Sequence, residues 1–475
     1  MRGADGLGPH KGARLPANGR MKRRDDVILG AGLAGLTAAH ELGELGETGW
    51  RVFERENRVG GHARSVEIDG YVFDYGPHIL FASDSELELL IRDLLGTNFV
   101  EQSREAYIYH HAYGRHTRFP FQAHLHGLPT DVVLDCLVSL VDAVEARARG
   151  EFAPVNYDEW MRGFFGDAIA ERLMIPYARK VWTVEPSTMD FTWIGSRVPT
   201  PDVGRILAGA LSDDVEQVGA TAQFWYPERG GIEALPRALG ERVQGVELGR
   251  EVEQIDVEAR TVTLSDGEEI AFKRMIYTLP LHALASLAPR VPAPVRDACK
   301  SLRFQGIYCL NVGIDRPQIS DKHWVYFYED DFPFHRLSFP ANFTPANVPP
   351  GKSSVSMEIA FSEERPLARE TIVDEAIAAL RQAGILRPDD TIELVHGMEI
   401  LPAYVIYDVD HSDNVGLIRT WLEEHGIQIA GRFGEWRYFN MDHAMKSGRD
   451  AARAATRESR DGRRARAAGR ALRKA

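Results

Sequence analysis

The feature that most constrains the fold is an apolar segment that runs directly into a glycine-rich turn. Val27-Ile28-Leu29 is typical of a buried strand, Gly30, Gly32 and Gly35 follow with G-x-G-x-x-G spacing, and residues 36–42 have the composition of a helix. In such a unit the first glycine permits the tight turn, the second lets a pyrophosphate approach the backbone, and the third lets the helix pack on the strand. The sequence therefore predicts a Rossmann-like dinucleotide site.

An acidic residue stands where a ribose contact is expected. Residues 50–53 form a second apolar segment, and Glu54 closes it. A carboxylate at this point accepts hydrogen bonds from the adenosine ribose and would repel the extra phosphate of NADP. Glycines also occur at helix starts for packing reasons alone, so the motif gains its weight from the strand before it and the acid after it.

A second glycine pair follows, with His62 beside it. Gly60-Gly61, preceded by Arg58 and followed by Ser65, resembles the second FAD fingerprint of flavoproteins of the glutathione reductase and amine oxidase type, in which this loop passes close to the flavin. NAD alone would not require this pair. The three pieces together predict FAD as the cofactor.

Length and composition indicate a large enzyme. The chain has 475 residues, of which 44% are apolar, and no uninterrupted apolar run approaches the ~18 residues of a membrane span. Cys136, Cys299 and Cys309 are widely spaced and form no C-x-x-C pair, which favours free thiols in a reducing cytoplasm. No metal-ligand spacing and no nucleophile elbow is apparent, so we expect no metal and a cytoplasmic enzyme.

The charge is distributed unevenly. Residues 1–24 hold seven Lys or Arg against one Asp, and residues 457–475 hold eight against two acids, so a net charge of −13 leaves −25 for the segment between them. An acidic body argues against a nucleic-acid partner, because the phosphate backbone would be repelled. We expect the two basic ends to be a disordered leader and a solvated tail.

The order of helical and strand patterns predicts an α/β fold: a Rossmann-like FAD-binding domain with an inserted helical subdomain and a second, mixed β-sheet substrate domain. The FAD-binding domain is expected to be discontinuous, formed by residues 25–82, 225–290 and 396–456. Helical patterns dominate part of residues 83–224, and a β-rich stretch lies within 291–395. These ranges are the predicted helical subdomain and substrate subdomain.

Further motifs narrow the type of flavoprotein. From about residue 27 to 455 the chain resembles the UDP-galactopyranose mutases, a branch of the amine-oxidase superfamily, and some motifs are closer to the eukaryotic members. The motifs that carry the resemblance are Gly60-Gly61-His62, Gly76-Pro77-His78-Ile79, Phe119-Pro120-Phe121-Gln122, Tyr177-Ala178-Arg179-Lys180-Val181-Trp182, Ser196-Arg197-Val198-Pro199, Trp324-Val325-Tyr326-Phe327 and Gly431-Arg432-Phe433-Gly434-Glu435-Trp436-Arg437-Tyr438.

The resemblance implies a cleft for a nucleotide-sugar diphosphate. Arg197 and Arg336 would hold the diphosphate, a task for which the planar guanidinium is suited, although each taken singly is more often a surface ion-pair residue. Asn440 departs from the bacterial mutases, which have Asp there. The residues that the resemblance places at the substrate are Phe121 and Gln122 at the nucleobase, Trp182 beside the sugar, and Tyr177, Tyr326, Tyr438 and Asn440.

The resemblance also implies a set of residues at the flavin. His62 would lie in a loop against the flavin edge, its carbonyl near N5, and would act with the two arginines. A helix opening after Asn440 would aim its N-terminus at the flavin pyrimidine ring and stabilise negative charge there. The cofactor-binding residues implied are Gly30, Gly32, Gly35, Glu54, Gly60, Gly61, Val252, Arg432, Met441 and Asp442.

The activity that the resemblance implies is an isomerisation of a nucleotide sugar between its pyranose and furanose forms, most simply UDP-galactopyranose and UDP-galactofuranose. N5 of reduced FAD would attack the anomeric carbon without net redox change, and a reductant such as NAD(P)H would first reduce the flavin. The exact sugar, the base and the oligomeric state are left open.

Two other interpretations of the sequence compete with that of a mutase. An oxidase or desaturase of the same superfamily would use oxidised flavin as a hydride acceptor, but its apolar substrate gains nothing from two phosphate-binding arginines. A non-catalytic FAD-binding partner protein would need no complete substrate cleft.

Overall fold

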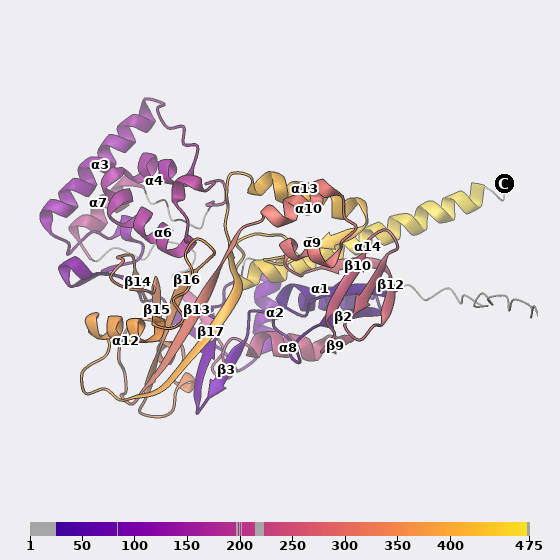
Figure 1. Cartoon of the computed structure of the whole chain (residues 1–475), viewed down its shortest axis with the longest axis horizontal. Helices are drawn as coiled ribbons and strands as arrows, with labels where there is room; N and C mark the ends of the chain where they lie inside the picture. The colour runs from indigo at the N-terminus through magenta and orange to yellow at the C-terminus, as the bar shows by residue number, and fades with distance from the viewer. Residues whose placement is uncertain are drawn as a thin grey trace, which may run out of the picture.

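The computed structural model describes residues 25–472 apart from 83, 196, 197, 199, 201 and 214–222, with side chains as far as residue 457. The expected leader, residues 1–24, lies outside the described residues. Within them, two large sheets stand side by side, helices cover the first sheet, and a separate group of helices stands at one end of the second (Figure 1). The predicted fold class is confirmed.

The first sheet is built around the glycine motif. Its strand order is β10-β11-β12-β1-β2-β9, and β18 pairs with β12 beside this path. The central strands β12, β1, β2 and β9 are parallel, as a Rossmann-like unit requires. Its strands are β1 (Asp25–Leu29), β2 (Trp50–Glu54), β9 (Val246–Leu248), β10 (Val252–Asp256), β11 (Thr261–Leu264), β12 (Glu269–Tyr277) and β18 (Ile427–Ile429).

Both faces of this sheet are covered, which is why its central strand β1 ends in the continuous apolar run Val27-Ile28-Leu29. Successive residues of β1 point to opposite sides, so Ile28 enters one core and Leu29 the other. The helices on the Ile28 side are α1 (Leu33–Glu44), α2 (Ser85–Leu95), α8 (Ala234–Arg242) and α14 (Met441–Leu472). Those on the Leu29 side are α9 (Leu284–Leu287), α10 (Ala293–Ser301) and α13 (His411–Glu424).

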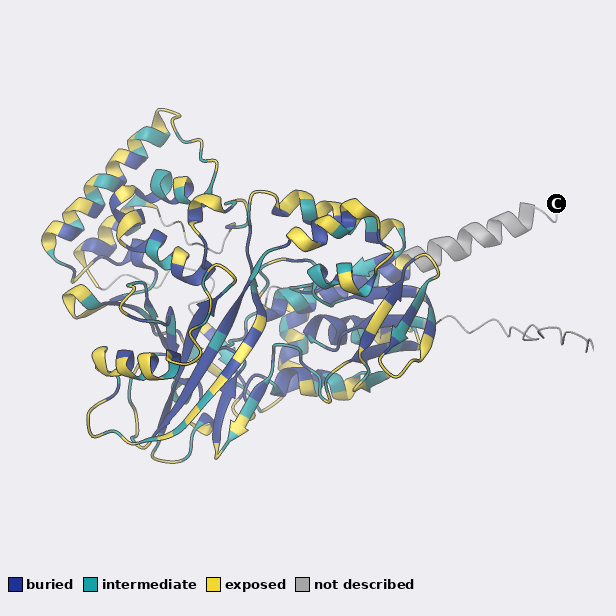
Figure 2. Ribbon diagram, viewed as in Figure 1, coloured by how far each residue is buried: buried dark blue, intermediate teal, exposed yellow. Residues whose placement is uncertain are grey.

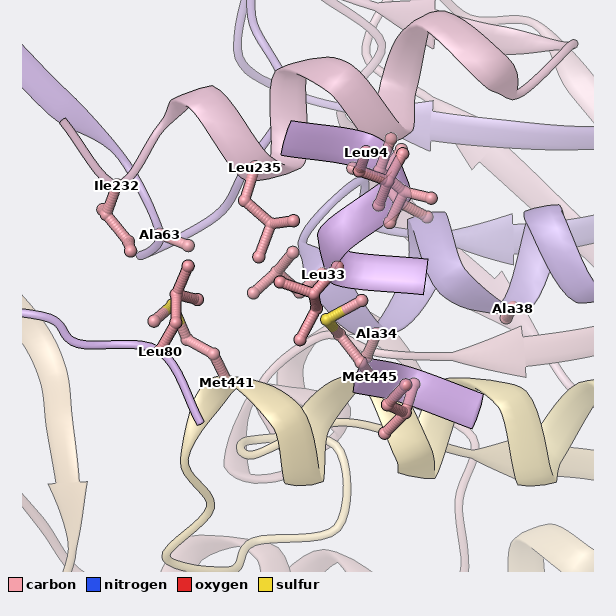
Figure 3. Close-up of a cluster of buried hydrophobic side chains, with 14 of the residues drawn as sticks. Leu33, Ala34, Ala38, Ala63, Leu80, Leu94, Ile232, Leu235, Met441 and Met445 are labelled. Atoms are coloured by element: carbon pink, nitrogen blue, oxygen red, sulfur yellow. The ribbon is translucent and has the colours of Figure 1, made fainter. Parts of the chain in front are cut away.

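The late helix α14 packs closely on the early helix α1. A Cβ built on Gly448 would lie 2.0 Å from the carbonyl oxygen of Ala34, so only glycine permits this approach. Leu33 of α1, Leu235 of α8 and Met445 of α14 converge in the shared core (Figure 3). The chain therefore returns at its end to the element that follows the glycine turn.

The second sheet is antiparallel except for the parallel pair β14–β6, and its order is β17-β13-β16-β15-β14-β6-β7. Its inner strands are largely buried, whereas the edge strand β17 is partly exposed (Figure 2), and α12 (Ile372–Gln382) covers one face. Its strands are β6 (Ala106–His110), β7 (Arg115–Arg118), β13 (Phe304–Ile314), β14 (Trp324–Phe327), β15 (Arg336–Ser338), β16 (Ser353–Phe361) and β17 (Ile392–Val405).

Two smaller sheets complete the strands. The hairpin β3–β4 (Ser65–Ile68 and Tyr71–Asp74) follows the second glycine pair, and β5 (Val100–Ser103) pairs with β8 (Gln223–Tyr226).

The helical group has its own core and includes a turn of π-helix. Side-chain caps start two helices of this group: Asn156 accepts from the Glu159 amide at α4, and Asp202 accepts from the Arg205 amide at α7. The group contains α3 (Thr130–Ala148), α4 (Tyr157–Phe165), α5 (Asp167–Ile169), the π-turn Ala170–Met174, α6 (Ile175–Trp182) and α7 (Val203–Leu211). Short single turns occur at His111–Tyr113, Phe121–Ala123, Pro186–Thr188, Leu281–Ala283, Pro340–Phe343 and Pro345–Asn347.

The proposed subdomain boundaries differ from the sheet boundaries in two places. β6 and β7, which fall in the range 83–224 expected to be helical, belong to the second sheet, and β17 crosses the expected boundary at residue 395. The reason is long-range pairing: β6 lies beside β14, more than 200 residues later. Such pairing leaves no local mark in the sequence.

Candidate cofactor and substrate site

Two of the three glycines in the first motif are required by the fold itself. Gly30 has φ +98°, and a Cβ on it would lie 2.6 Å from Oγ1 of Thr278. A Cβ on Gly35 would lie 2.0 Å from the carbonyl oxygen of Gly30. Neither position accepts a side chain without a backbone shift, whatever the ligand.

Gly32 is different, because the protein leaves space beside it. Its φ of −72° suits any residue, and the nearest heavy atom to a built Cβ is the Cα of Gly61, 3.8 Å away. Gly32 also caps α1 without a side-chain hydrogen bond, among the described residues, so the first amides of α1 are open to a ligand. This open cradle at a helix N-terminus fits a pyrophosphate.

The second glycine pair completes that cradle. Gly32 and Gly60 form a bridge, in which the Gly60 amide donates to the Ala31 carbonyl at 2.9 Å. Gly60 and Gly61 both have positive φ, 118° and 60°, which glycine tolerates. The two glycine motifs, about 30 residues apart in sequence, therefore face each other across one space.

Glu54 lies at the end of β2, beside the glycine turn. Its Oε2 accepts from the Ala31 amide at 2.8 Å, and its Oε1 accepts from the Glu56 amide at 3.1 Å. The carboxylate is therefore held at the turn, where a ribose is expected. Val252, also predicted at the cofactor, begins β10 and is buried in the core on the Leu29 side.

His62 and Arg432 meet beside the glycine cradle. The His62 ring lies edge-on to Phe433 with centroids 5.2 Å apart, and burial, followed by the Arg432 charge, lowers its pKa to about 3. His78 donates from Nδ1 to the Gly76 carbonyl at 2.7 Å, and burial lowers its pKa to about 4. Both imidazoles are therefore neutral at physiological pH.

Arg432 is held by uncharged groups. Its Nη1 donates to the Phe439 carbonyl and its Nη2 to the Ala403 carbonyl, both at 2.9 Å. Its guanidinium lies over the rings of Tyr404 and Tyr438, 4.6 and 4.9 Å from their centroids. No ion pair to a carboxylate is found for Arg432 within the described part of the chain, so its charge can act on a bound anion.

The start of α14 carries the last predicted residues of this group. Met441 is buried in the core of Figure 3, and Asp442 is buried with Oδ1 3.2 Å from Nδ1 of His443. Asn440 is exposed, and its carbonyl accepts from the Ala444 amide in the first helical turn. Asn440 does not line the cavity described next, whereas the other residues predicted at the nucleobase, the sugar and the tyrosine positions do: Phe121, Gln122, Tyr177, Trp182, Tyr326 and Tyr438.

A cavity of about 250 Å³ lies between the helical group and the second sheet. It brings together side chains from α6, from the turn after β7, from β14 and β15, and from the loop before α14. The sequence-predicted residues that line it are Phe121, Gln122, Tyr177, Trp182, Tyr326, Arg336 and Tyr438. Arg197 lies outside the described residues.

Other lining residues were not predicted. Leu173 and Met174 come from the π-turn, Tyr328 and His335 from the segment between β14 and β15, Trp193 from a loop, and Tyr404 from β17. Aromatic and apolar residues of this kind are most often core residues, and their local sequence does not distinguish the two cases. The π-turn is the one signal with functional precedent, since such turns are frequent at functional sites, but it is visible only in the structure.

Arg336 is oriented by a buried carboxylate. In the pairing of β15 with β16, Arg336 stands opposite Glu358; Nε donates to Oε1, and Nη2 donates to Oε2 at 2.8 Å. Burial alone would lower the pKa of Arg336, but Glu358 raises it well above its usual value. The fork with Glu358 occupies Nε and Nη2, which leaves Nη1 for a ligand in the cavity.

The helix α6 is anchored to the second sheet from behind. Lys180 is almost fully buried and donates from Nζ to the Glu329 carbonyl at 2.6 Å, while Gln305 donates to the Val181 carbonyl at 3.1 Å. Burial, with the Arg365 charge second, lowers the pKa of Lys180 to about 7. These bonds hold the helix that presents Tyr177 and Trp182 to the cavity.

Comparison with known proteins assigns the chain to a family. The sequence pattern of the flavin-containing amine oxidoreductases matches residues 33–456. The chain belongs to this family. The cofactor of this flavin-containing amine oxidoreductase is accordingly FAD, as predicted, and the open cradle at Gly32 fits the pyrophosphate of that group.

Within the family the fold is close to that of a UDP-galactopyranose mutase. A crystal structure of the reduced mutase matches with a TM-score of 0.85 at 28% identity, covering 90% of this chain and 93% of the other. A putative protoporphyrinogen oxidase of Exiguobacterium shares the fold at a TM-score of 0.68 and 19% identity, covering 92% of this chain and all of the other. The predicted resemblance to the mutases is confirmed.

In sequence, the family member has both oxidase and mutase relatives. It is 24% identical over 451 residues to protoporphyrinogen oxidase 1 of Spinacia oleracea, covering 85% of this chain and 78% of the relative. It is 26% identical over 181 residues to a protein of Klebsiella pneumoniae named as a probable UDP-galactopyranose mutase, covering 36% and 44% of the two chains.

Two kinds of feature are absent from the described residues. No helix there is both long and apolar enough to cross a membrane. The same part of the chain contains no group of three or more His, Cys, Asp or Glu side chains placed to hold a metal ion.

Proposed function

We propose that this flavoenzyme is a nucleotide-sugar mutase that interconverts the pyranose and furanose forms of UDP-galactose or of a related nucleotide sugar. The observation that carries the proposal is the cavity: seven side chains named by the mutase resemblance, from five separate segments of the chain, line one space, and one of them is a partly buried arginine. The match to the reduced mutase structure supports the same assignment.

The charged end of the substrate is assigned to Arg336. Arg336 lines a cavity whose walls are otherwise mostly aromatic, where a hydrogen bond between charged groups gains strength from the low dielectric. Glu358 holds the guanidinium plane, so a diphosphate meets an arginine that is already oriented. Arg197 is the second proposed diphosphate residue.

The aromatic walls are assigned to the nucleoside and the sugar. Phe121 would stack on the base while the Gln122 amide reads its edge, and the hydroxyls of Tyr326 and Tyr438 would donate to phosphate oxygens. Trp182 would contact the sugar. Each of these side chains lies in the cavity wall, so the proposal needs no rearrangement of the described residues.

Bound in its reduced form, FAD would supply the nucleophile, N5, for the anomeric carbon of the sugar. The open cradle at Gly32 would hold its pyrophosphate, and Glu54 its ribose. Arg432 would stabilise negative charge near the isoalloxazine, because its own charge is met by uncharged partners. His62, neutral in this setting, would add no competing positive charge.

A redox-balance experiment tests the proposal. The purified flavoprotein is reduced anaerobically and incubated with UDP-galactopyranose and other nucleotide sugars, and the products are separated by chromatography. A mutase converts many equivalents of sugar per flavin without consuming further reductant, because the reaction has no net redox change.

The similarity to the Spinacia protoporphyrinogen oxidase favours a second candidate, an oxidase. The same experiment in air separates the two. Oxygen uptake or hydrogen peroxide release that matches substrate turnover mole for mole would establish the oxidase and reject the mutase. A partly buried arginine in the cavity wall argues for the mutase, because an apolar oxidase substrate offers it no anion.

A further inference from the structure

Tyr407 lies behind the cavity, between two of its walls. Its ring stacks on Trp193, with centroids 5.4 Å apart and planes at 18°, and its hydroxyl oxygen accepts from the Tyr438 amide at 2.6 Å. Trp193 and Tyr438 both line the cavity, and Tyr407 itself is buried and does not. Tyr407 therefore contacts two cavity residues: Trp193 in the helical region and Tyr438 in the loop before α14.

The link to the helical side extends beyond the ring stack. The Asp190 amide donates to the Tyr407 carbonyl at 2.9 Å, and Met189 forms a bridge with Asp408. The Trp193 indole in turn donates to the Asp190 carbonyl at 2.7 Å. The segment that carries Trp193 is thus bound to residues 407–408 by both backbone and ring.

The link to the other side includes a strained turn. Trp436 is fully buried with φ +53°, a conformation that bulky residues rarely adopt. Its carbonyl accepts from Nε2 of His411 at 3.0 Å, and the His411 ring packs on Tyr407 with centroids 4.2 Å apart. Tyr407 and His411 together hold the turn that places Tyr438.

We infer that Tyr407 is a positioning residue that sets the spacing between Trp193 and Tyr438 and thereby the width of the cavity at its Trp182 end. The inference rests on the proposed function for its catalytic consequence. The rings of Trp182, Trp193 and Tyr438 pack edge to face, 5.0 to 6.3 Å apart, so a shift of either linked wall changes the space available to a sugar. The Tyr407 hydroxyl holds Tyr438 through a hydrogen bond, and the Tyr407 ring holds Trp193 through stacking.

Two variants separate the two contacts. Tyr407→Phe keeps the stack on Trp193 and removes the hydroxyl, whereas Tyr407→Leu removes both. Tyr71→Phe is the matched control. It also removes the hydroxyl of a buried tyrosine, which donates a hydrogen bond to Glu393, and Tyr71 lies at the start of β4. All proteins are studied loaded with FAD, and flavin content and melting temperature are recorded for each.

In Tyr407→Phe we expect the Tyr438 amide to exchange hydrogen about three- to tenfold faster, the effect of one lost hydrogen bond, with flavin content and melting temperature equal to those of Tyr71→Phe. The kcat/KM for the nucleotide sugar should fall by a similar factor, while the Kd for UMP, which lacks the sugar, stays within twofold. In Tyr407→Leu, residues 189–195 should also exchange faster, and tryptophan emission should shift to the red.

Unchanged exchange at the Tyr438 amide in Tyr407→Phe would overturn the inference. Equal weakening of UMP binding and of nucleotide-sugar turnover would overturn it as well, because it would show a general loss of packing. If the wild type converts no nucleotide sugar, the proposed function fails, and amide exchange and tryptophan emission still decide whether Tyr407 links the two walls.

Discussion

Replacing Gly32 by valine should weaken FAD binding while leaving the protein folded. A Cβ at this position meets only the Cα of Gly61, 3.8 Å away, and φ is −72°. The fold therefore tolerates a side chain here, whereas the same change at Gly35 places a Cβ 2.0 Å from the carbonyl oxygen of Gly30. Gly32 is therefore required for ligand binding, whereas Gly35 is required for the fold.

The expected magnitudes follow from this geometry. Gly32→Ala should change the free energy of unfolding of the apoprotein little, or raise it by roughly 0.4–1 kcal/mol, because alanine restricts the unfolded chain. Gly32→Val adds three carbons to the space of the pyrophosphate, and overpacking costs about 1–3 kcal/mol. At ~1.4 kcal/mol per tenfold, the Kd for FAD should rise by about 5- to 150-fold. Gly35→Ala should instead lower the stability of the apoprotein by about 1–3 kcal/mol or more.

The assay measures each apoprotein in two ways. Thermal or urea unfolding gives stability, and titration with FAD, followed by flavin fluorescence, gives the Kd. Wild-type affinity in Gly32→Val would refute the placement of the pyrophosphate over Gly32. Apoprotein stability lowered in Gly32→Ala as much as in Gly35→Ala would refute the claim that the fold does not need this glycine.

Three further predictions concern the ionisable side chains Arg336, Lys180 and His62. Arg336→Lys should keep full FAD content and lose activity by tenfold or more in the isomerase assay, because lysine lacks the forked guanidinium. Arg336→Ala leaves Glu358 buried without its partner, and it should also lower the free energy of unfolding in urea by about 3–5 kcal/mol. Burial, followed by the Arg365 charge, lowers the pKa of Lys180 from 10.5 to about 7 in the folded state. Between these two pH values the unfolded chain binds the proton more tightly, so the free energy of unfolding should fall as the pH falls from about 10.5 to 7, by on the order of 5 kcal/mol from this group. Below pH 7 this group should cause no further loss. Lys180→Met should flatten that dependence, and equal slopes in wild type and variant would contradict the assignment. His62, with its pKa near 3, should contribute no inflection to activity between pH 5 and 8, so His62→Asn should alter the rate and not the shape of the pH profile.

The cofactor motif was predictable because it is local. The strand, the three glycines, the helix and Glu54 fall within about 25 consecutive residues, and each has a direct backbone or charge requirement. The match of residues 33–456 to the family and the parallel order of β12, β1 and β2 confirm what those residues predicted. The role of Gly32 could be separated from that of Gly35 only when their neighbours in space were known.

The substrate cavity was predictable only through resemblance. The resemblance named seven of its lining residues, six of them in four quoted motifs and Arg336 outside those motifs, but composition and periodicity gave no reason to bring these segments together. Trp193, Tyr404 and His335 were missed, because aromatic or buried histidine residues have the same local pattern in a core as in a cavity wall. Asn440 was named and lies outside the cavity, on the exposed start of α14.

Local sequence was sufficient to predict the dinucleotide unit, the FAD cofactor and the α/β class, because these depend on contacts between near neighbours in the chain. The partner of Arg336, the strands that join β14, and the placement of Tyr407 between Trp193 and Tyr438 became known only from the three-dimensional arrangement. Those contacts join residues between about 20 and more than 200 positions apart. Their register is set by the packing of whole sheets and helices, and no single segment carries it.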